Sequence, residues 1–418
     1  MNIGMVGLGK LGFPVAVGIA AKGHTVYGHD LNKDAIVDFN YGNEGGPDSQ
    51  TSFEKFYEAN GDNIHFVDLE TLCVSSDIIF IAVQTPHEAK YEGVTRIPND
   101  RKDFDYKYLF NAIRDIEYWL EKPTPVVVIS TVLPGSLRNY LEEWRPCLNK
   151  DKNNLILSFN PYFIAMGTVI KDFYDPEFVL IGSDYGAPEI IEKFYKTIHN
   201  KPVINMSIES AELTKVAYNT FIGMKIAFAN TLMEICHKIP NASVDDVTNA
   251  LKQATDRLIS PKYLTAGMGD GGGCHPRDNI AMSWLAQKLN LSHNLFDDVM
   301  KAREDQTDWL AKLICGYSTI KTLPVCILGY AFKANNNLTT GSPAILLKNL
   351  VEEKGVPVTM CDPHINCWHH NKPAVYFIGT KHDVLQEVKF PKGSVVIDPF
   401  RYIPYQEGVE VVRIGEHK

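Results

Sequence analysis

The fold is decided near the N-terminus by the stretch Ile3-Gly4-Met5-Val6-Gly7-Leu8-Gly9-Lys10-Leu11-Gly12. A short apolar strand runs directly into GxGxxG, residues 13–22 have the composition of a helix, and a second strand over 24–28 leads to Asp30. Glycines at these spacings allow a tight turn and the approach of a pyrophosphate to the helix N-terminus. An acid at Asp30 can bind the adenosine ribose hydroxyls and disfavours the extra phosphate of NADP. The pattern predicts an NAD site formed by Gly7, Gly9, Lys10, Leu11, Gly12 and Asp30.

Further apolar strands follow at 77–83, 126–129, 155–163 and 178–182, separated by helical stretches. Such an alternation predicts a parallel sheet buried on both faces, whose ligands bind at the carboxyl ends of the strands. Thr85 and Thr131 fall at those ends and are candidate cofactor contacts, although either threonine can instead cap the next helix. The polar stretch from 87 to 107 is expected to be a surface excursion.

The middle of the chain carries two features of chemical interest. Residues 209–238 lack proline and read as one helix about 45 Å long, on which Lys215 and Asn219 share a face. Such a pair is either partly buried and functional or simply solvated. Behind this helix the glycine-rich run 267–273 ends on Cys274, and a helix is expected over 279–288. A thiol at a loop-to-helix junction feels the positive end of the helix dipole, which favours the thiolate; the alternative is a flexible turn with an incidental cysteine.

The last hundred residues form a second βαβ pattern without GxGxxG. Strands are expected at 325–328, 356–360, 375–378 and 394–397, with a helix from Pro343 to Lys354. Lys333 follows the first of these strands and is either a phosphate contact or a surface lysine. The expected fold is therefore α/β, with two Rossmann-like doubly wound domains joined by a long central helix and a helical middle region. We predict domains at 1–205 (NAD binding), 206–318 (central, helical) and 319–418 (a second Rossmann-like domain with the shape of a nucleotide-binding domain).

Composition narrows the function. The 418 residues carry a formal net charge of −9, which argues against general affinity for nucleic acid or acidic membranes. No apolar run is long enough to span a bilayer, and no secretory signal is evident. Eight cysteines without CxxC pairs indicate a reduced, cytoplasmic protein. Cys361, Cys367, His369 and His370 cluster, but their spacing fits no zinc pattern, so no metal is expected.

Together these motifs resemble the UDP-glucose/GDP-mannose dehydrogenase family of nucleotide-sugar dehydrogenases. The resemblance covers nearly the whole chain in order: GLGKLGFP, the Thr85-Pro86 turn, STVLPGS, the Lys215-x-x-x-Asn219 helix, the Cys274 loop with Asp278, GYAFK with SPA, and CDP. GMGDGGGC is spelled more like the branch acting on N-acetylated hexosamine nucleotides than like the UDP-glucose enzymes. The resemblance implies that the domain at 319–418 binds the nucleotide sugar, and a UDP-sugar substrate and a homodimer are the expected partners.

The resemblance implies that a primary alcohol at sugar C6 is oxidised twice by NAD+, through a thioester on Cys274 that water hydrolyses to a uronic acid. It implies that Lys215, Asn219 and Asp278 organise the oxyanion and the water, and that Thr131 lies by the nicotinamide. A positive lysine would stabilise both thiolate and oxyanion. The implied substrate contacts are Tyr162, Phe163, Lys215, Gly271, Lys333 and Arg257, the last resembling an arginine that reaches a neighbouring subunit's site.

Two segments depart from the family. The family's NPEFxxEG, whose glutamates serve catalysis, is here Asn160-Pro161-Tyr162-Phe163-Ile164-Ala165-Met166-Gly167, without either carboxylate. Losing a general base costs about 10²–10⁴ in rate, and thioester hydrolysis is the step most exposed to that loss. The segment after GYAFK, residues 336–341, keeps neither the family's acids nor its arginine.

Four functions therefore stay open on sequence grounds. The first is a C6 dehydrogenase that activates water with Asp278 or His275. The second keeps NAD and the thiol but stops at an aldehyde or returns the hydride in a redox-neutral rearrangement. A β-hydroxyacid dehydrogenase would need neither the cysteine loop nor the second nucleotide domain. A non-catalytic sugar-nucleotide binder would have no need of Cys274, Lys215 and Asp278.

Overall fold

The computed structural model describes residues 1–32, 50–145, 154–165, 167–184, 188–258, 260–269, 272–366 and 372–416, with backbone alone for 50–54. Contacts divide the chain into two units, one of 1–86 with 104–217 and one of 87–103 with 218–418. The predicted three-domain boundaries stay a prediction.

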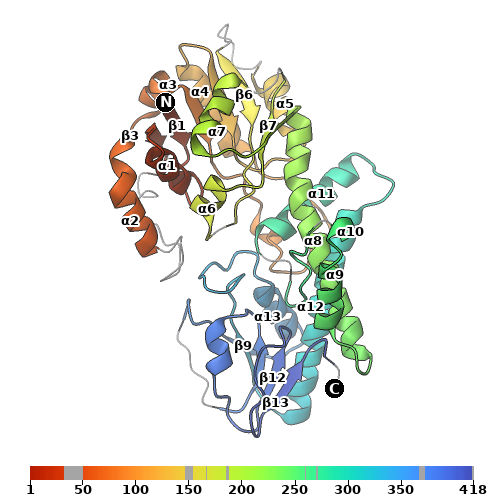
Figure 1. The fold of residues 1–418 in the computed structure, drawn as a ribbon. Coiled ribbons are helices and arrows are strands. Elements are labelled where there is room, and N and C mark those ends of the chain that lie inside the picture. Colours follow the sequence, from red (N-terminus) through yellow and green to blue (C-terminus); the bar gives the residue numbers. More distant parts are fainter. Residues whose placement is uncertain are drawn as a thin grey trace. The chain divides into compact units, whose positions relative to one another are not determined.

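The first unit is built on an eight-stranded sheet (Figure 1). Its strands are parallel, except that β6 and β7 pair antiparallel. In spatial order they are β3 (Ile64–Phe66), β2 (Thr25–His29), β1 (Asn2–Val6), β4 (Ile78–Ile81), β5 (Thr124–Val128), β6 (Leu155–Phe159), β7 (Val179–Gly182) and β8 (Val203–Met206). The reversal of strand order beside β1 places the carboxyl ends of β1 and β4 at a topological switch point, where such sheets bind ligands.

Helices cover both faces of this sheet, as its unbroken apolar strands require. One core lies under α1 (Gly12–Ala21), α2 (Gln50–Asn60), α6 (Val169–Tyr174) and α7 (Glu189–Ile198). The other lies under α3 (Leu69–Ser75), α4 (Lys107–Trp119), α5 (Ser136–Asn139) and the start of α8. Two short segments complete the unit: η2 (Gly61–Asn63) and the π-helical η4 (Tyr140–Trp144).

The second unit contains a five-stranded, fully parallel sheet. Its order is β10 (Val358–Cys361), β9 (Val325–Leu328), β11 (Val375–Ile378), β12 (Val395–Asp398) and β13 (Glu410–Arg413). One face packs against α12 (Leu295–Lys321), α13 (Pro343–Glu353) and the end of α8, and the other against η6 (Asp383–Glu387) and its flanking loops. The remaining helices are α9 (Val244–Lys252), α10 (Thr255–Leu258), α11 (Cys274–Lys288) and η3 (Ala89–Tyr91).

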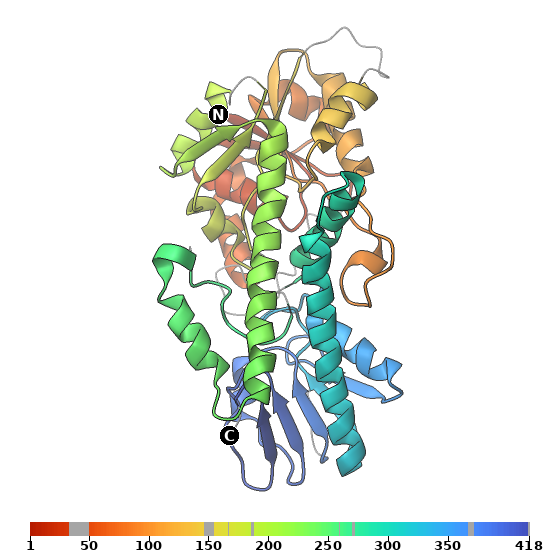
Figure 2. The ribbon, with the colours of Figure 1, turned by 90° about the vertical axis from the view of Figure 1, so that its right-hand side faces the viewer.

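The helix predicted over 209–238 is confirmed as α8, Ile208–Lys238, and Figure 2 shows it unbroken along its length. It passes from the first unit into the second after Ala217. With both sheets observed, the predicted α/β class with two Rossmann-like units is confirmed. No described helix combines the length and the apolar composition that crossing a membrane requires.

The polar surface excursion expected over 87–107 is present, because its side chains are exposed or half-buried except at Tyr91, Gly93 and Phe104. Residues 87–103 belong to the second unit, and Tyr91 is fully buried with Ile280 and Met300. Arg96 anchors the segment by pairing with Glu304, Asp308 and Glu353 at 3.2, 3.1 and 2.7 Å. The charged side chains of the segment thus lie at the surface and form ion pairs there.

Candidate functional site

The glycine loop between β1 and α1 has the shape that a dinucleotide requires. Gly7 has φ +92°, and a Cβ there would lie 2.8 Å from the backbone of Ala82. A Cβ at Gly12 would lie 1.9 Å from the Gly7 carbonyl oxygen, so the helix can start this close to the turn only with glycine. Among the residues that the structure describes, none beyond the two chain neighbours has an atom within 4 Å of a Cβ built on Gly9. The open side of the loop is therefore at Gly9, where a pyrophosphate can approach the backbone.

Asp30 is held at the end of β2 beside this loop. Its carboxylate accepts the backbone N–H of Leu8 at 2.7 Å and that of Asn32 at 2.8 Å. Asp30 is half-buried. In the glycine loop Lys10 is exposed and Leu11 is half-buried. These residues fit NAD, because the acid is fixed where ribose hydroxyls would meet it.

The carboxyl ends of β4 and β5 are tied together by hydroxyl groups. Thr85 is buried and donates its hydroxyl proton to the Thr131 carbonyl oxygen at 2.7 Å. Ser130 donates to the Val83 carbonyl oxygen at 2.5 Å. The Thr85 hydroxyl therefore holds the neighbouring loop in register, while the half-buried Thr131 side chain lies at the strand end where ligands bind.

Lys215 projects from α8 onto the segment that replaces the family's glutamate motif. Its ammonium donates to the Tyr162 carbonyl oxygen at 2.9 Å and lies 5.0 Å from the centre of the Phe163 ring. The side chain is 8% exposed, so it is not the solvated lysine of the alternative interpretation. Lys215 is thus a desolvated cation held by a main-chain dipole and an aromatic face.

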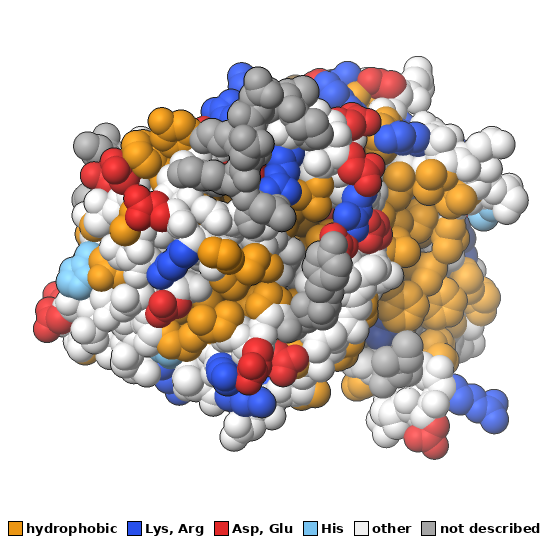
Figure 3. Space-filling view, turned by 90° about the horizontal axis from the view of Figure 1, so that it is seen from above, with side chains coloured by type: hydrophobic (Ala, Val, Ile, Leu, Met, Phe, Trp, Pro, Cys, Tyr) orange, Lys and Arg blue, Asp and Glu red, His pale blue; other side chains and the backbone are white. Residues whose placement is uncertain are grey.

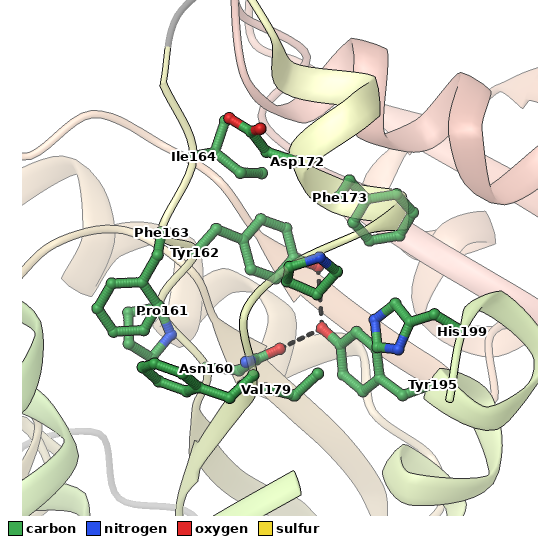
Figure 4. Close-up of a pocket in the computed structure, with 12 residues that line it drawn as sticks. Asn160, Pro161, Tyr162, Phe163, Ile164, Asp172, Phe173, Val179, Tyr195 and His199 are labelled. Carbon is green, nitrogen blue, oxygen red and sulfur yellow. Dashed lines mark hydrogen bonds between the residues drawn. The ribbon is translucent and has the colours of Figure 1, made fainter. Parts of the chain in front are cut away.

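The Tyr162 side chain turns into the interior of the first unit. Figure 4 shows it lining a pocket whose residues come from the 160–164 segment, α6, the strand β7 with its approach, and α7. The phenol oxygen lies 3.1 Å from that of Tyr195, and Tyr195 also donates to Asn160 Oδ1. Burial raises the pKa of Tyr162 well above its usual value, so the phenol is neutral. Tyr162 therefore supplies a carbonyl group, and not a base, to Lys215.

In the second unit Asn219 and Asp278 form a buried pair. Asn219 Nδ2 donates to Asp278 Oδ2 at 2.7 Å, and the two side chains are 7% and 0% exposed. Arg277 Nε lies 3.4 Å from the other carboxylate oxygen. His87 lies beside them. Its burial, and to a smaller extent the charge of Arg277, lower the pKa of His87 to about 4, so this imidazole is neutral at pH 7. The structure thus brings Asn219 and Asp278 together, and their role in organising the oxyanion and the water stays a prediction.

Cys274 begins α11, five residues earlier than the sequence predicted. The side chain is exposed, and a 15-residue helix directs the positive end of its dipole at it. Pro276 falls in the first turn, where a backbone N–H would have no partner within the helix. The proline is therefore tolerated there, and the helix can start before it. Of the cysteines in the described ranges, this is the one that combines exposure with a favourable local field.

The backbone before Cys274 is packed too closely for side chains. A Cβ at Gly269 would lie 2.2 Å from Pro343, and one at Gly272 would lie 2.7 Å from Phe332. Asn230 on α8 fixes the loop by accepting Gly267 N–H at 3.0 Å and donating to the Gly269 carbonyl oxygen at 3.3 Å. The glycines thus allow close approach to the segment after β9, and the sequence did not single out Asn230.

The other predicted substrate contacts are less constrained. Lys333 is half-buried, with its ammonium 5.6 Å from the Phe332 ring centre, close to the glycine loop's packing partner. Arg257 is exposed on the short α10. Gly271 lies outside the described residues, as does Met166.

The second sheet also has an aspartate after one of its strands, but this side chain binds groups of the protein itself. Asp362 follows β10 as Asp30 follows β2, and it accepts the N–H groups of Tyr330 and Ala331 at 2.7 and 2.9 Å. Burial acts to raise the pKa of Asp362, but its hydrogen bonds outweigh burial and lower the pKa to about 2. The hydrogen bond from His382 contributes most to this lowering. Because Asp362 is 0% exposed, it is closed to a ribose, in keeping with the missing GxGxxG.

Glu212 on α8 is a buried acid that the sequence analysis missed. Its carboxylate accepts Gly135 N–H at 2.6 Å and Leu137 N–H at 3.0 Å, at the N-terminus of α5, which follows Thr131 in the sequence. Burial raises its pKa to about 7, with the two N–H groups opposing that rise. The spacing of three residues to Lys215 was the available signal, since both then share a helix face.

This raised pKa predicts a measurable pH dependence of stability. The folded state binds the Glu212 proton more tightly than the unfolded chain, so the stabilisation is complete below about pH 4.5 and lost as pH rises through about 7. Relative to Glu212→Gln, the wild-type free energy of unfolding should fall by about 3 kcal/mol over that window. Denaturant unfolding at pH 5 and 7.5 measures this. The exposed Glu58→Gln is the control, and parallel curves for wild type and Glu212→Gln would contradict the assignment.

Charge on the visible surface is mixed in sign. In Figure 3 acidic and basic side chains are interspersed over the face shown, with hydrophobic patches between them. Within the described ranges, no three His, Cys, Asp or Glu side chains are grouped to hold a metal ion. Of the predicted metal-like cluster, Cys367, His369 and His370 lie outside those ranges.

Comparison with known proteins shows which family the chain belongs to. Residues 1–199 match the NAD binding domain of the UDP-glucose/GDP-mannose dehydrogenase family, and 209–304 match its central domain. The chain is 29% identical over 376 residues to UDP-glucose 6-dehydrogenase of Rhizobium meliloti (strain 1021), covering 87% of this chain and 82% of that protein. It is 28% identical over 374 residues to GDP-mannose 6-dehydrogenase of Pseudomonas aeruginosa, with 87% and 82% covered.

The fold of the chain is also similar to that of a solved nucleotide-sugar dehydrogenase. The structure of a UDP-glucose dehydrogenase from Pyrobaculum islandicum superimposes with a TM-score of 0.81 at 23% identity, covering 99% of this chain and 98% of that one. The predicted resemblance is confirmed, and so is NAD as the cofactor of the N-terminal unit. The chain belongs to the UDP-glucose/GDP-mannose dehydrogenase family.

Proposed function

We propose that this protein oxidises the C6 primary alcohol of a nucleotide sugar with NAD+, through a covalent intermediate on Cys274. The observation that carries the proposal is an exposed cysteine at the N-terminus of α11, with the buried Asn219–Asp278 pair one turn further along. Bound NAD+ supplies a hydride acceptor in each of two oxidations. The relatives named for UDP-glucose and GDP-mannose are equally similar, so both nucleotides belong among the candidates.

The residues divide the steps between them. Loss of a hydride and a proton from the alcohol gives an aldehyde, to which the Cys274 thiolate adds. The Lys215 ammonium and the Asn219 amide stabilise the oxyanion that forms. Departure of a second hydride leaves a thioester, and water then releases the uronic acid and regenerates the thiol. A free thiol in this role suits a reducing compartment such as the cytoplasm.

A second candidate function rests on Tyr162. Its phenol is neutral, buried and hydrogen bonded to Tyr195, so this position supplies no base for thioester hydrolysis. Asp278 and His275 remain as acids or bases near Cys274 in sequence, but Asp278 is 0% exposed. An enzyme so equipped would hydrolyse the thioester slowly, stop at the aldehyde, or return the hydride to the substrate.

One experiment separates these functions. A panel of UDP-glucose, UDP-N-acetylhexosamines and GDP-mannose is incubated with NAD+, and the NADH formed is counted per sugar consumed. Two NADH per sugar support full oxidation. One NADH or none, with a product formed, supports the second candidate function. Binding of a sugar nucleotide by calorimetry without any turnover would contradict both.

We also propose a homodimer formed through α8. Phe221, Phe228 and Ile235 are seven residues apart and 42%, 52% and 46% exposed, which makes an apolar stripe on one helix face. Arg257, which resembles a residue reaching the neighbouring subunit's site, would then need the dimer for its role.

The stripe predicts the effect of a charge on it. Phe228→Asp should shift the light-scattering mass from twice the chain mass to the chain mass, because a charge would be buried in the interface. Ile320→Asp, at a 79% exposed position on α12, should leave the mass unchanged. A wild-type monomer, or a Phe228→Asp dimer, would refute the α8 interface.

A further inference from the structure

The Lys215 ammonium is held in part by a main-chain carbonyl group. Lys215 Nζ lies 2.9 Å from the Tyr162 oxygen, in an irregular segment that follows β6. A carbonyl group in such a segment is placed only as well as the segment itself is held. What holds residues 160–164 therefore contributes to the placement of this charge.

A row of hydrogen bonds holds the segment to β7 and α7. Asn160 Nδ2 donates to the Leu180 carbonyl oxygen at 2.7 Å. Its Oδ1 accepts from the Tyr195 hydroxyl, and the phenol oxygens of Tyr195 and Tyr162 lie 3.1 Å apart. Figure 4 shows the Tyr162 and Tyr195 hydroxyl groups pointing toward one another, with the Asn160 side chain beside the Tyr195 hydroxyl.

The direction of the protons follows from the chemistry of the groups. An amide oxygen can only accept, so the single Tyr195 proton goes to Asn160, and Tyr162 provides the proton between the two phenols. Burial raises the pKa of both tyrosines well above the usual value, so the row stays intact through the pH range of an enzyme assay.

We propose that Tyr195 is a positioning residue: its hydroxyl, acting through the Tyr162 phenol, fixes the carbonyl group that holds the Lys215 ammonium. Where the family has a carboxylate after Asn160-Pro161, this chain has a tyrosine that locks the main chain instead. The role of Lys215 in the reaction rests on the proposed function, but its placement does not.

The kinetic test is Tyr195→Phe, which removes one hydroxyl and keeps the ring. We expect kcat for NADH formation to fall by about tenfold to a hundredfold, as for a small misplacement of a catalytic group. KM for NAD+ should change by less than twofold. Tyr376→Phe, which removes a buried phenol that donates to the Lys372 carbonyl oxygen at 2.6 Å in the second unit, should leave both constants unchanged.

A second readout needs no turnover. The rate of reductive methylation of Lys215, followed by peptide mass spectrometry, should rise at least threefold in Tyr195→Phe and stay unchanged in Tyr376→Phe. Unchanged labelling of Lys215 in Tyr195→Phe would overturn the proposal, whether or not kcat changes. If no sugar nucleotide is oxidised by the wild type, the proposed function fails while the labelling result still decides the placement.

Discussion

Replacing Cys274 by alanine should abolish uronic acid formation and leave at most one NADH per sugar consumed. Without the thiol no thioester can form, so the aldehyde has no covalent route to the second oxidation. Loss of a nucleophile typically costs at least about 10³ in rate, well beyond the effect of a local packing change. NADH absorbance together with mass spectrometry of the sugar nucleotide measures both quantities.

The matched control is Cys315→Ala on α12. Cys315 is half-buried, and burial raises the pKa of its thiol, so it is held in the unreactive form. Its removal should leave the ratio of NADH to sugar unchanged. Uronic acid formed at the wild-type rate by Cys274→Ala would remove Cys274 from the mechanism.

The intact wild type offers a companion measurement. If water attacks the thioester slowly because position 162 supplies no carboxylate, the acyl enzyme should accumulate. Mass spectrometry of the quenched enzyme would then find the sugar-nucleotide acyl group on the peptide containing Cys274. Its absence, with two NADH formed per sugar, would show that another group activates water efficiently.

Much of the fold followed from patterns local to the chain. The strands predicted at 325–328 and 375–378 are β9 and β11 with the same bounds, because buried parallel strands are unbroken apolar runs. The strands that were missed, β3, β8 and β13, lie at sheet edges or are only three or four residues long. Their alternation is too short to stand out from a loop.

The site was predictable where a motif fixes the backbone and not where distant partners fix a side chain. The roles of Gly7 and Gly12 follow from spacing alone, and the close contacts agree. The inward turn of Tyr162 depends on Tyr195, more than thirty residues later in the sequence, which no local pattern reveals. For Glu212 the spacing to Lys215 indicates a shared helix face, but its partners Gly135 and Leu137 come from another part of the chain, which no local pattern reveals.

Restoring the family's glutamate by Tyr162→Glu should destabilise the protein rather than speed hydrolysis. The side chain at 162 points into a pocket lined by Phe173, Tyr195 and other apolar or neutral groups, with Asp172 the charged lining residue. A carboxylate placed there loses its hydration without gaining a cation, at a cost of about 3–5 kcal/mol. The melting temperature should fall by about 10 °C.

The pH dependence identifies the buried charge as the cause. Burial favours the protonated carboxyl group, so the stability deficit of Tyr162→Glu should shrink as pH falls from 7 to 5. Tyr162→Gln, of the same size but without a charge, should show a smaller deficit that does not vary with pH. If Tyr162→Glu instead melts like the wild type and forms uronic acid faster, the segment can turn its side chain outward toward Lys215. The lock by Tyr195 would then be too weak to place the ammonium.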